Sequence, residues 1–452
     1  MIMGRLFGTD GARGVANTEL TCELAMSIGK AAAMVLIKDE KGKKPTVFIG
    51  KDTRLSSDML EGALTAGLCS VGANVVHLGT IPTPAVAFLV RKHGADAGIM
   101  ISASHNPFEF NGIKLFNNEG YKLPDALEEE IEAIVLDNAE PYPVPEGSGL
   151  GCVSYLPEAI DEYVDHIAAS IDGDLKGLKI AVDCSNGSAS ATAAKLFDKL
   201  GADYKIMNYE PDGVNINEKC GSTHIELLQD YVKEHKLDGG VAFDGDADRC
   251  LAVDENGDLV DGDFLIAICA KSLKEKGRLK NNAAVGTVMT NMGFNQFCEK
   301  NEINFIATAV GDRYVLESML ENDYCIGGEQ SGHVIFLEYG TTGDGQLTAV
   351  QLLNIMQEKN KSLSQLASVM KRFPQVLINV KVSTAKKSEY ADDEVIKATV
   401  ADIEAELGNR GRVLVRPSGT EPLIRVMLEG EDKNEITKHA NTIADLIRER
   451  LG

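Results

Sequence analysis

The sequence has no run of apolar residues long enough to cross a membrane. The most apolar helical stretch, residues 24–37, is interrupted by Lys30, and it falls short of the about 20 residues that a membrane-spanning helix needs. Residues 1–7 lack the architecture of a signal peptide. We therefore expect a cytoplasmic protein with no membrane partner.

Paired cysteines are also missing. The nine cysteines are scattered along the chain, and no two of them form a Cys-x-x-Cys pair. An odd, dispersed set without an export signal indicates reduced thiols, which again predicts the cytoplasm. No zinc-binding pattern is visible.

Positive net charge is the third feature that the chain lacks. Its formal charge is −23 at pH 7, whereas nucleic acid is bound by a concentrated basic surface. The composition therefore argues against a nucleic-acid partner.

The sequence does contain regularly alternating strand and helix patterns. With 452 residues, 44% of them apolar, the chain is long enough for about three or four domains. Short apolar runs separated by helical patterns are typical of a doubly wound α/β sheet. The runs are at 46–50, 74–78 and 96–102, with a helix expected at 56–71; then at 179–184, 204–207 and 240–243; then at 284–289, 304–308 and 324–327.

From residue 373 the pattern changes to strand, helix, strand, strand, helix, at 376–382, 392–407, 412–415, 423–428 and 433–450. We predict three consecutive doubly wound α/β domains plus a C-terminal α+β domain. The expected boundaries are 1–152, 153–256, 257–371 and 372–452, and the Pro- and Gly-rich residues 141–151 are the expected first linker.

A serine follows one of the buried strands directly. Residues 98–101 form an apolar run, and residues 102–107 read Ser-Ala-Ser-His-Asn-Pro, so the turn chemistry of Asn106 and Pro107 presents the Ser104 hydroxyl. His105 and Lys114 supply a polarisable and a cationic neighbour, as an activated nucleophile requires. An ordinary turn is the alternative interpretation.

Three carboxylates follow another buried strand. Asp244, Asp246 and Asp248 stand at alternate positions after residues 239–243, and an all-oxygen set of this kind suits a hard cation such as Mg²⁺. An EF-hand is rejected, because Arg249 stands where its glycine belongs and strands flank the loop. A solvated acidic turn remains the alternative.

A third candidate loop lies near the C-terminus, between two strands. Successive N–H groups at Ser418, Gly419 and Thr420 can form an anion-binding nest, and Arg416 and Arg425 can bind phosphate oxygens. The alternative is a plain hairpin. Two further glycine-rich loops, at 7–14 and 326–333, each carry little information alone.

Together these loops resemble a known family. Residues 8–13, 102–107, 244–249, 328–333 and 416–422 occur in the order and approximate spacing of the α-D-phosphohexomutase superfamily, over nearly the whole chain. The serine loop, residues 220–224 and Gln330 resemble the bacterial phosphoglucosamine mutase branch more than the phosphomannomutase/phosphoglucomutase branch. The resemblance implies four domains around a central cleft, with one motif in each.

The resemblance also implies a role for each motif. Ser104 carries a phosphoryl group, and Asp244, Asp246 and Asp248 hold a Mg²⁺ that also touches this phosphate. Lys114 is the first choice for general acid/base, with a pKa lowered by neighbouring cations; a lysine that only pairs with phosphate is the alternative.

Several other residues take supporting roles under this resemblance. Arg13 and Arg249 neutralise the transferring group, with His105 and His333 in support. Glu329 and Ser331 bind sugar hydroxyls. The non-reacting phosphate is gripped by Arg416, Ser418, Gly419, Thr420 and Arg425.

The acidic chain must reverse its electrostatic field locally to accept phosphate. Eight basic residues lie in or beside the glycine-rich loops and are expected to do this: Arg13, Lys51, Arg54, Lys114, Arg249, Arg313, Arg416 and Arg425.

The function implied by the resemblance is interconversion of glucosamine 6-phosphate and glucosamine 1-phosphate. It would proceed through a bisphosphorylated sugar, which also primes the serine, and would feed UDP-N-acetylglucosamine synthesis. The alternatives are a phosphomannomutase/phosphoglucomutase and a catalytically silent phosphosugar-binding protein. A homodimer is the candidate assembly.

Overall fold

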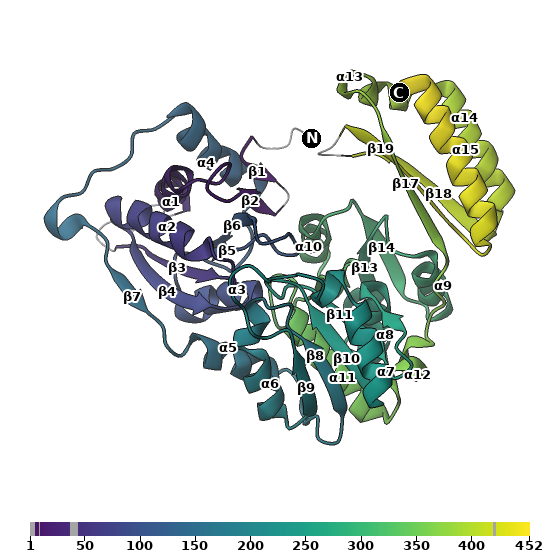
Figure 1. Ribbon diagram of the computed structural model, residues 1–452, viewed down its shortest axis with the longest axis horizontal. Helices are drawn as coiled ribbons and strands as arrows, with labels where there is room; N and C mark the ends of the chain where they lie inside the picture. Colours follow the sequence, from purple (N-terminus) through teal and green to yellow (C-terminus); the bar gives the residue numbers. More distant parts are fainter. Residues whose placement is uncertain (1–4, 9, 37–43, 419–421) are drawn as a thin grey trace. The chain divides into compact units, whose positions relative to one another are not determined.

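The computed structural model describes residues 5–8, 10–36, 44–418 and 422–452, without the side chains of residues 384, 385, 388 and 391. The chain divides into two compact units. The first comprises residues 1–289 and 302–369, and the second comprises residues 290–301 and 370–452. Each unit is described by itself (Figure 1).

The first unit begins with a seven-stranded mixed sheet. Its strands, in spatial order, are β1 (Phe7–Gly8), β2 (Gly11–Val15), β6 (Phe110–Asn117), β5 (Ala97–Ile101), β3 (Thr46–Lys51), β4 (Asn74–Thr80) and β7 (Val153–Tyr155). Strands β5, β3, β4 and β7 are parallel, and the others are antiparallel to their neighbours. Its helices are α1 (Cys22–Leu36), α2 (Ser57–Ser70), α3 (Thr83–His93) and α4 (Asp125–Asp137).

Helices cover both faces of this sheet. Side chains along a strand alternate between the two faces, so successive residues of β5 show what packs on each face. Ile99 and Ile101 of β5 belong to the core that α1, α2 and α4 complete. On the opposite face Gly98 leaves room for Val86 and Val90 of α3. A strand buried on both sides reads as a continuous apolar run, which is why β5 was recognisable in the sequence.

The second sheet has five strands. Their order is β12 (Leu259–Val260), β11 (Cys250–Asp254), β10 (Gly239–Phe243), β8 (Lys179–Asp183) and β9 (Asp203–Met207). Strands β10, β8 and β9 are parallel. The helices of this part are α5 (Ala159–Ala168), α6 (Ala193–Leu200) and α7 (Glu226–His235).

The third sheet has four strands. Their order is β14 (Asn304–Thr308), β13 (Ala283–Thr287), β15 (Ile326–Gly328) and β16 (Val334–Phe336), and only β16 is antiparallel. Its helices are α8 (Gly262–Glu275), α10 (Asp312–Glu321), α11 (Gly345–Lys359) and α12 (Leu363–Ala367). Short 3₁₀ turns of this unit are η1 (Gly147–Gly149), η2 (Ser188–Ala191), η3 (Gly221–Thr223) and η4 (Lys280–Asn282).

The second unit is an α+β structure. Its antiparallel sheet has the order β17 (Gln375–Lys381), β19 (Leu423–Gly430) and β18 (Gly411–Pro417). Helices α14 (Glu394–Leu407) and α15 (Lys433–Leu451) lie side by side against the sheet and complete its core (Figure 1). The unit also holds α9 (Met292–Lys300), α13 (Thr384–Lys387), η5 (Ser388–Asp392) and η6 (Gly408–Arg410).

The predicted fold class is confirmed: three mixed α/β sheets with helices are followed by an α+β sheet. The expected linker at 141–151 contains only the short turn η1. The first sheet, however, continues past residue 152, because Val153–Tyr155 pairs with β4. No helix in the described part of the chain is long and apolar enough to span a membrane.

Candidate active site

Three candidate loops of the first unit each follow an interior strand of their own sheet. Ser104 comes after β5, Asp244 comes after β10, and Glu329 comes after β15. Open α/β sheets bind ligands at the carboxyl ends of their strands. Each loop therefore lies at the carboxyl end of its strand, which is the part of such a sheet where ligands bind.

The Ser104 turn has an unusual backbone. Ser104 has a φ of +53°, a left-handed conformation that few residues other than glycine adopt readily. Its carbonyl oxygen accepts hydrogen bonds of 2.9 Å from Arg54 Nη2 and of 2.9 Å from Asn217 Nδ2. Its N–H donates to Ser102 Oγ, which in turn donates to Asp52. The surrounding side chains thus hold the serine in this conformation.

The Ser104 hydroxyl points at residues 244–249, the loop predicted to bind the metal and called the metal loop below. Its Oγ donates to Asp244 Oδ2 at 2.6 Å, and the residue is only 1% exposed. The loops approach so closely that a Cβ on Gly245 would lie 2.5 Å from the Ser104 carbonyl oxygen. Glycine at this position is therefore required for the serine and the aspartate to meet.

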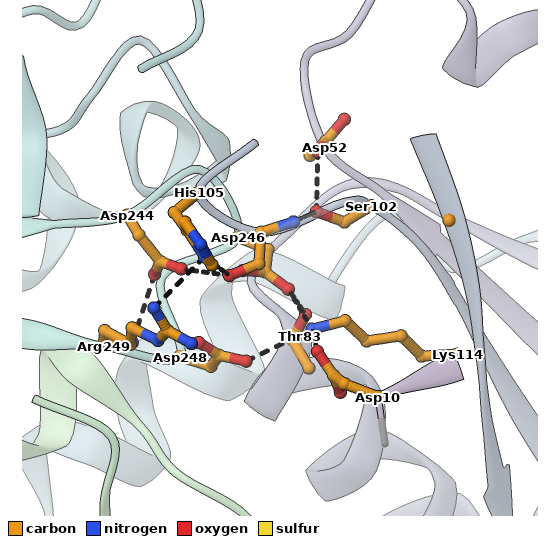
Figure 2. Close-up of polar contacts among 12 residues, drawn as sticks. Asp10, Asp52, Thr83, Ser102, His105, Lys114, Asp244, Asp246, Asp248 and Arg249 are labelled. Carbon is orange, nitrogen blue, oxygen red and sulfur yellow. Dashed lines mark hydrogen bonds and ion pairs between the residues drawn. The ribbon is translucent and has the colours of Figure 1, made fainter. Parts of the chain in front are cut away.

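The three aspartates form one buried cluster. Asp244, Asp246 and Asp248 each present a carboxylate oxygen within 4.8 Å of the others, and all three are at most 2% exposed. Figure 2 shows the three side chains close to one another and to Arg249, and Thr83 donates to Asp246. Burial raises the pKa of Asp244 well above its usual value, and repulsion from Asp248 and Asp246 adds to this.

These carboxylates suit a hard cation. Within the described residues, Oδ1 of Asp246 and Oδ1 of Asp248 are buried without a hydrogen-bond partner. Buried polar atoms are normally satisfied, and an all-oxygen donor set is the one that hard divalent ions prefer. The cluster is therefore able to bind a metal ion, and the solvated acidic turn is excluded.

Lys114 lies inside a ring of carboxylates. Its Nζ is 2.7 Å from Asp246 Oδ2, 3.2 Å from Asp248 Oδ2 and 3.0 Å from Asp10 Oδ2. Figure 2 shows the side chain reaching toward Asp10 and Asp246. Burial opposes its charge, but the attraction of the three carboxylates outweighs burial and raises the pKa of Lys114 well above its usual value.

The expectation that neighbouring cations lower the pKa of Lys114 is therefore wrong for this arrangement. Arg13 does lower this pKa, but its effect is smaller than those of Asp10, Asp246 and Asp248. The sequence places Lys114 near the arginine-bearing loops, but it does not show that carboxylates are its direct partners.

Arg249 and His105 form a second pair beside the serine. Arg249 Nη1 lies 3.1 Å from His105 Nδ1, and the Arg249 N–H donates to Asp244 Oδ1 at 3.2 Å. Burial, followed by the charges of Arg249 and Arg13, lowers the pKa of His105 to about 4. His105 is therefore a neutral imidazole at neutral pH. Arg13 is ion-paired with Asp10.

The loop with Glu329, Ser331 and His333 packs directly on the metal loop. The Cys250 N–H donates to the Gly332 carbonyl, and Glu329 Oε1 accepts from the Gly311 N–H at 3.1 Å. A Cβ on Gly332 would lie 2.2 Å from the Cys250 carbonyl oxygen. Among the described residues, Ser331 Oγ and both His333 ring nitrogens are buried without hydrogen-bond partners, and His333 Nε2 lies 3.5 Å from the Asp312 carboxylate.

The predicted phosphate loop belongs to the second unit. Arg416 and Arg425 stand opposite each other where β18 pairs with β19. Burial and then the charge of Arg425 lower the pKa of Arg416, because like charges facing each other disfavour the charged form. Ser418 is buried. Gly419 and Thr420 lie outside the described residues.

Three of the eight basic residues expected to attract phosphate form ion pairs with carboxylates outside the aspartate cluster. Arg54 pairs with Asp52 at 2.8 Å and donates to loop carbonyls, so it supports the serine turn. Lys51 pairs with Asp58 and Glu61. Arg313 pairs with two carboxylates of α4. Their neighbours already neutralise these charges.

Sequence reasoning missed several residues that complete the site. Asp10 lies in the glycine-rich motif at residues 8–13, but the motif predicts no role for it. Lys122, Asn217 and Asp312 stand in no motif, although each contacts a residue of the site. Thr83, which donates to Asp246, is a further example. Only the folded chain brings these residues together.

The chain belongs to the phosphoglucomutase/phosphomannomutase family. Models of that family match α/β/α domain I at residues 4–141, domain II at 161–257, domain III at 261–373 and the C-terminal domain at 377–446. The resemblance found in the sequence is thereby confirmed.

The chain is similar over its full length to particular members. It is 57% identical over 450 residues to the phosphoglucosamine mutase of Acetivibrio thermocellus, covering 100% of both chains. It is 55% identical over 448 residues to that of Clostridium beijerinckii, covering 99% of this chain and 100% of the relative.

Among solved structures, a phosphoglucomutase/phosphomannomutase family protein of Burkholderia thailandensis matches with a TM-score of 0.81. The identity is 22%, and the match covers 99% of this chain and 98% of the other. This match shows the shared fold.

Proposed function

We propose that this enzyme interconverts glucosamine 6-phosphate and glucosamine 1-phosphate. Its similarity to phosphoglucosamine mutases over the whole chain supports the substrate. The observation that carries the chemistry is the Ser104 hydroxyl, held 2.6 Å from Asp244 in a buried carboxylate cluster. Binding alone would not require a serine placed in this way, which disfavours a catalytically silent phosphosugar-binding protein.

The proposed reaction passes through a phosphoserine. The phosphoryl group moves from Ser104 to the free hydroxyl of the sugar phosphate, so that the Oγ–P bond breaks and a P–O bond to the sugar forms. The sugar hydroxyl loses its proton, and Ser104 Oγ gains one. The bisphosphorylated sugar then reorients, and its other phosphoryl group returns to Ser104. Such a transfer depends mainly on positioning and charge neutralisation.

We assign the proton transfers to Lys114. It is buried and touches two of the three clustered aspartates, next to the one that accepts from Ser104. As an ammonium it can donate to the serine oxygen when the phosphoryl group leaves. Arg249 and Arg13 supply further positive charge beside the serine, and neutral His105 orients Arg249.

We propose Mg²⁺ as the ion for the aspartate cluster. Asp244, Asp246 and Asp248 would hold it together with the phosphate on Ser104. When bound, such an ion neutralises charge on the transferring phosphoryl group. The unpartnered oxygens of Asp246 and Asp248 support this proposal.

Sugar recognition is assigned to Glu329 and Ser331, with His333 in support, because their loop packs on the metal loop. The facing arginines Arg416 and Arg425, with Ser418, Gly419 and Thr420, would hold the phosphate that is not reacting.

We also propose a cytoplasmic location, a homodimer and a role in the supply of UDP-N-acetylglucosamine. The proposed domain boundaries are 1–152, 153–256, 257–371 and 372–452.

Substrate choice is tested by comparing kcat/KM for glucosamine, glucose and mannose 6-phosphates on one preparation, each primed with its own bisphosphate. An amine at carbon 2 is a cation near neutral pH, which the Glu329 carboxylate favours electrostatically. We expect preference for the amino sugar with weak activity on glucose phosphate. Equal or better values for glucose or mannose would assign the chain to the phosphomannomutase/phosphoglucomutase activity.

A further inference from the structure

A largely buried lysine outside the predicted motifs joins two distant carboxylates. Lys122 follows strand β6, and its Nζ lies 2.5 Å from Asp10 Oδ1 and is also ion-paired with Asp312. These partners are 112 and 190 residues away along the chain. The Lys122 side chain is 10% exposed. This bridge therefore ties the amino-terminal loop to the start of α10.

Each of these carboxylates has a second partner in the active site. Asp10 Oδ2 lies 3.0 Å from Lys114 Nζ, a contact that Figure 2 shows. Asp312 Oδ2 lies 3.5 Å from His333 Nε2. A continuous row of charged and polar groups thus runs from His333 through Asp312, Lys122 and Asp10 to Lys114. Lys122 occupies its centre.

Lys122 is the only cation that these contacts place between Asp10 and Asp312 among the described residues. Burial opposes its charge, but Asp10 and Asp312 outweigh burial and raise its pKa. Removing one partner of a buried ionic group leaves the other charges uncompensated. Without Lys122 the two carboxylates would repel each other and move, taking their contacts to Lys114 and His333 with them.

We propose that Lys122 is a positioning residue for the mutase reaction. By fixing Asp10 against Lys114 and Asp312 against His333, it holds in place both the proton-transfer lysine and the loop that carries Glu329, Ser331 and His333. This inference rests on the proposed function. Small displacements of a reacting group cost large factors in rate, so the bridge acts on turnover as well as on stability.

The surroundings allow Lys122 to be replaced without overpacking. Lys122, Asp312 and His333 line a cavity of about 250 Å³ whose wall also includes Leu123, Leu316 and Ile335. Methionine has nearly the length of lysine, lacks the charge and adapts to irregular space. Lys122→Met therefore removes the ammonium while leaving an apolar stem against an apolar wall.

The experiment compares Lys122→Met, Lys122→Arg and the double variant Lys122→Met/Asp312→Asn with the wild type. Lys280→Met is the matched control, because Lys280 is an exposed lysine paired only with Asp323 among the described carboxylates. For each protein, kcat and KM for glucosamine 6-phosphate are measured, kcat is divided by the phosphoserine content, and the melting temperature is recorded. Dividing by phosphoserine removes the effect of a smaller folded fraction.

We expect Lys122→Met to lower kcat per phosphoserine by about 10- to 100-fold and to raise KM, and Lys122→Arg to recover part of both. The double variant removes one carboxylate with the ammonium. Its melting temperature should rise from that of Lys122→Met toward the wild-type value, while its kcat should stay low. Lys280→Met should match the wild type in both.

Two results would overturn the proposal. The first is a Lys122→Met variant with wild-type kcat per phosphoserine. The second is full recovery of kcat in the double variant, which would show that Lys122 only neutralises the charge of Asp312 and positions nothing. Should Lys122→Met fail to fold, the double variant decides by the same criterion. A wild-type enzyme without activity on glucosamine 6-phosphate would instead contradict the proposed function.

Discussion

Asn217 and Ser104 come from different sheets, yet Asn217 Nδ2 donates a 2.9 Å hydrogen bond to the Ser104 carbonyl oxygen. The same amide also reaches the carbonyl of Asn106 at 3.1 Å. The second α/β part of the chain therefore helps to hold the left-handed turn of the first. The serine is placed by two parts of the fold and not by its own loop alone.

This relationship makes Asn217→Gly a sharp test. Asn217 itself has a φ of +59°, so glycine removes the amide without adding backbone strain. Freed from this contact, the turn should relax, and we expect kcat per phosphoserine to fall about tenfold. Asn360→Gly is the matched control, because this exposed helix-capping asparagine also has a positive φ. Equal kcat in both variants would show that Arg54 alone is enough to hold the turn of Ser104.

The carboxylate cluster predicts how the enzyme depends on its metal. Asp246→Asn keeps the shape of the side chain and removes one of three clustered charges. The Mg²⁺ concentration giving half-maximal activity should therefore rise, about tenfold or more. Asp58→Asn, at a side chain that is 85% exposed, serves as the control. Superimposable Mg²⁺ activation curves for all three proteins would rule out this metal assignment.

The facing arginines predict a phosphate contact common to both half-reactions. Arg425→Ala removes a charge-assisted hydrogen bond worth about 1.5–3 kcal/mol, so kcat/KM should fall roughly ten- to hundred-fold in each direction of the reaction. Arg410→Ala, at an arginine paired with Glu435, is the control within the same unit. A loss confined to one direction would mean that Arg425 serves a single orientation of the sugar.

Asp344 predicts a pH dependence of stability. It caps α11 and accepts from Tyr163, and burial raises its pKa to about 7, while the unfolded chain keeps a value near 3.9. Between these values the folded state binds more protons, so this group lowers stability as the pH rises from about 4 to 7.

Asp344→Asn should keep the cap and remove this dependence. The melting temperature of the variant relative to wild type should therefore increase between pH 5 and pH 8. Asp432→Asn, at the exposed cap of α15, is the control for the substitution itself. A difference from wild type that is the same at both pH values would contradict the role of Asp344.

Much of this molecule could be predicted from local sequence. Strands such as Ala97–Ile101 and Gly239–Phe243 are buried on both faces, so they read as continuous apolar runs. Ser104 and Asp244 follow these runs within three residues, and their loops contain turn-forming residues. Local patterns of this kind predict the fold class and single out Ser104 and Asp244 as candidates, whereas only the family resemblance implied that the two act together.

Contacts between distant segments could not be predicted. Lys122 reaches Asp312 across 190 residues, and Asn217 reaches Ser104 across 113. No local pattern marks these residues, because their role exists only after the sheets have packed. The same limit explains the wrong direction expected for the pKa of Lys114, which depends on three carboxylates from two other loops.

The central claim is that Ser104 carries the phosphoryl group, and a transfer experiment tests it most directly. The enzyme is primed with glucosamine 1,6-bisphosphate labelled in phosphate, isolated, and then mixed with unlabelled glucosamine 6-phosphate. We predict label on Ser104, its passage into the sugar bisphosphate at a rate no slower than kcat, and neither labelling nor turnover in a folded Ser104→Ala variant. Label that stays on the protein during turnover, or wild-type kcat in Ser104→Ala, would contradict the phosphoserine mechanism.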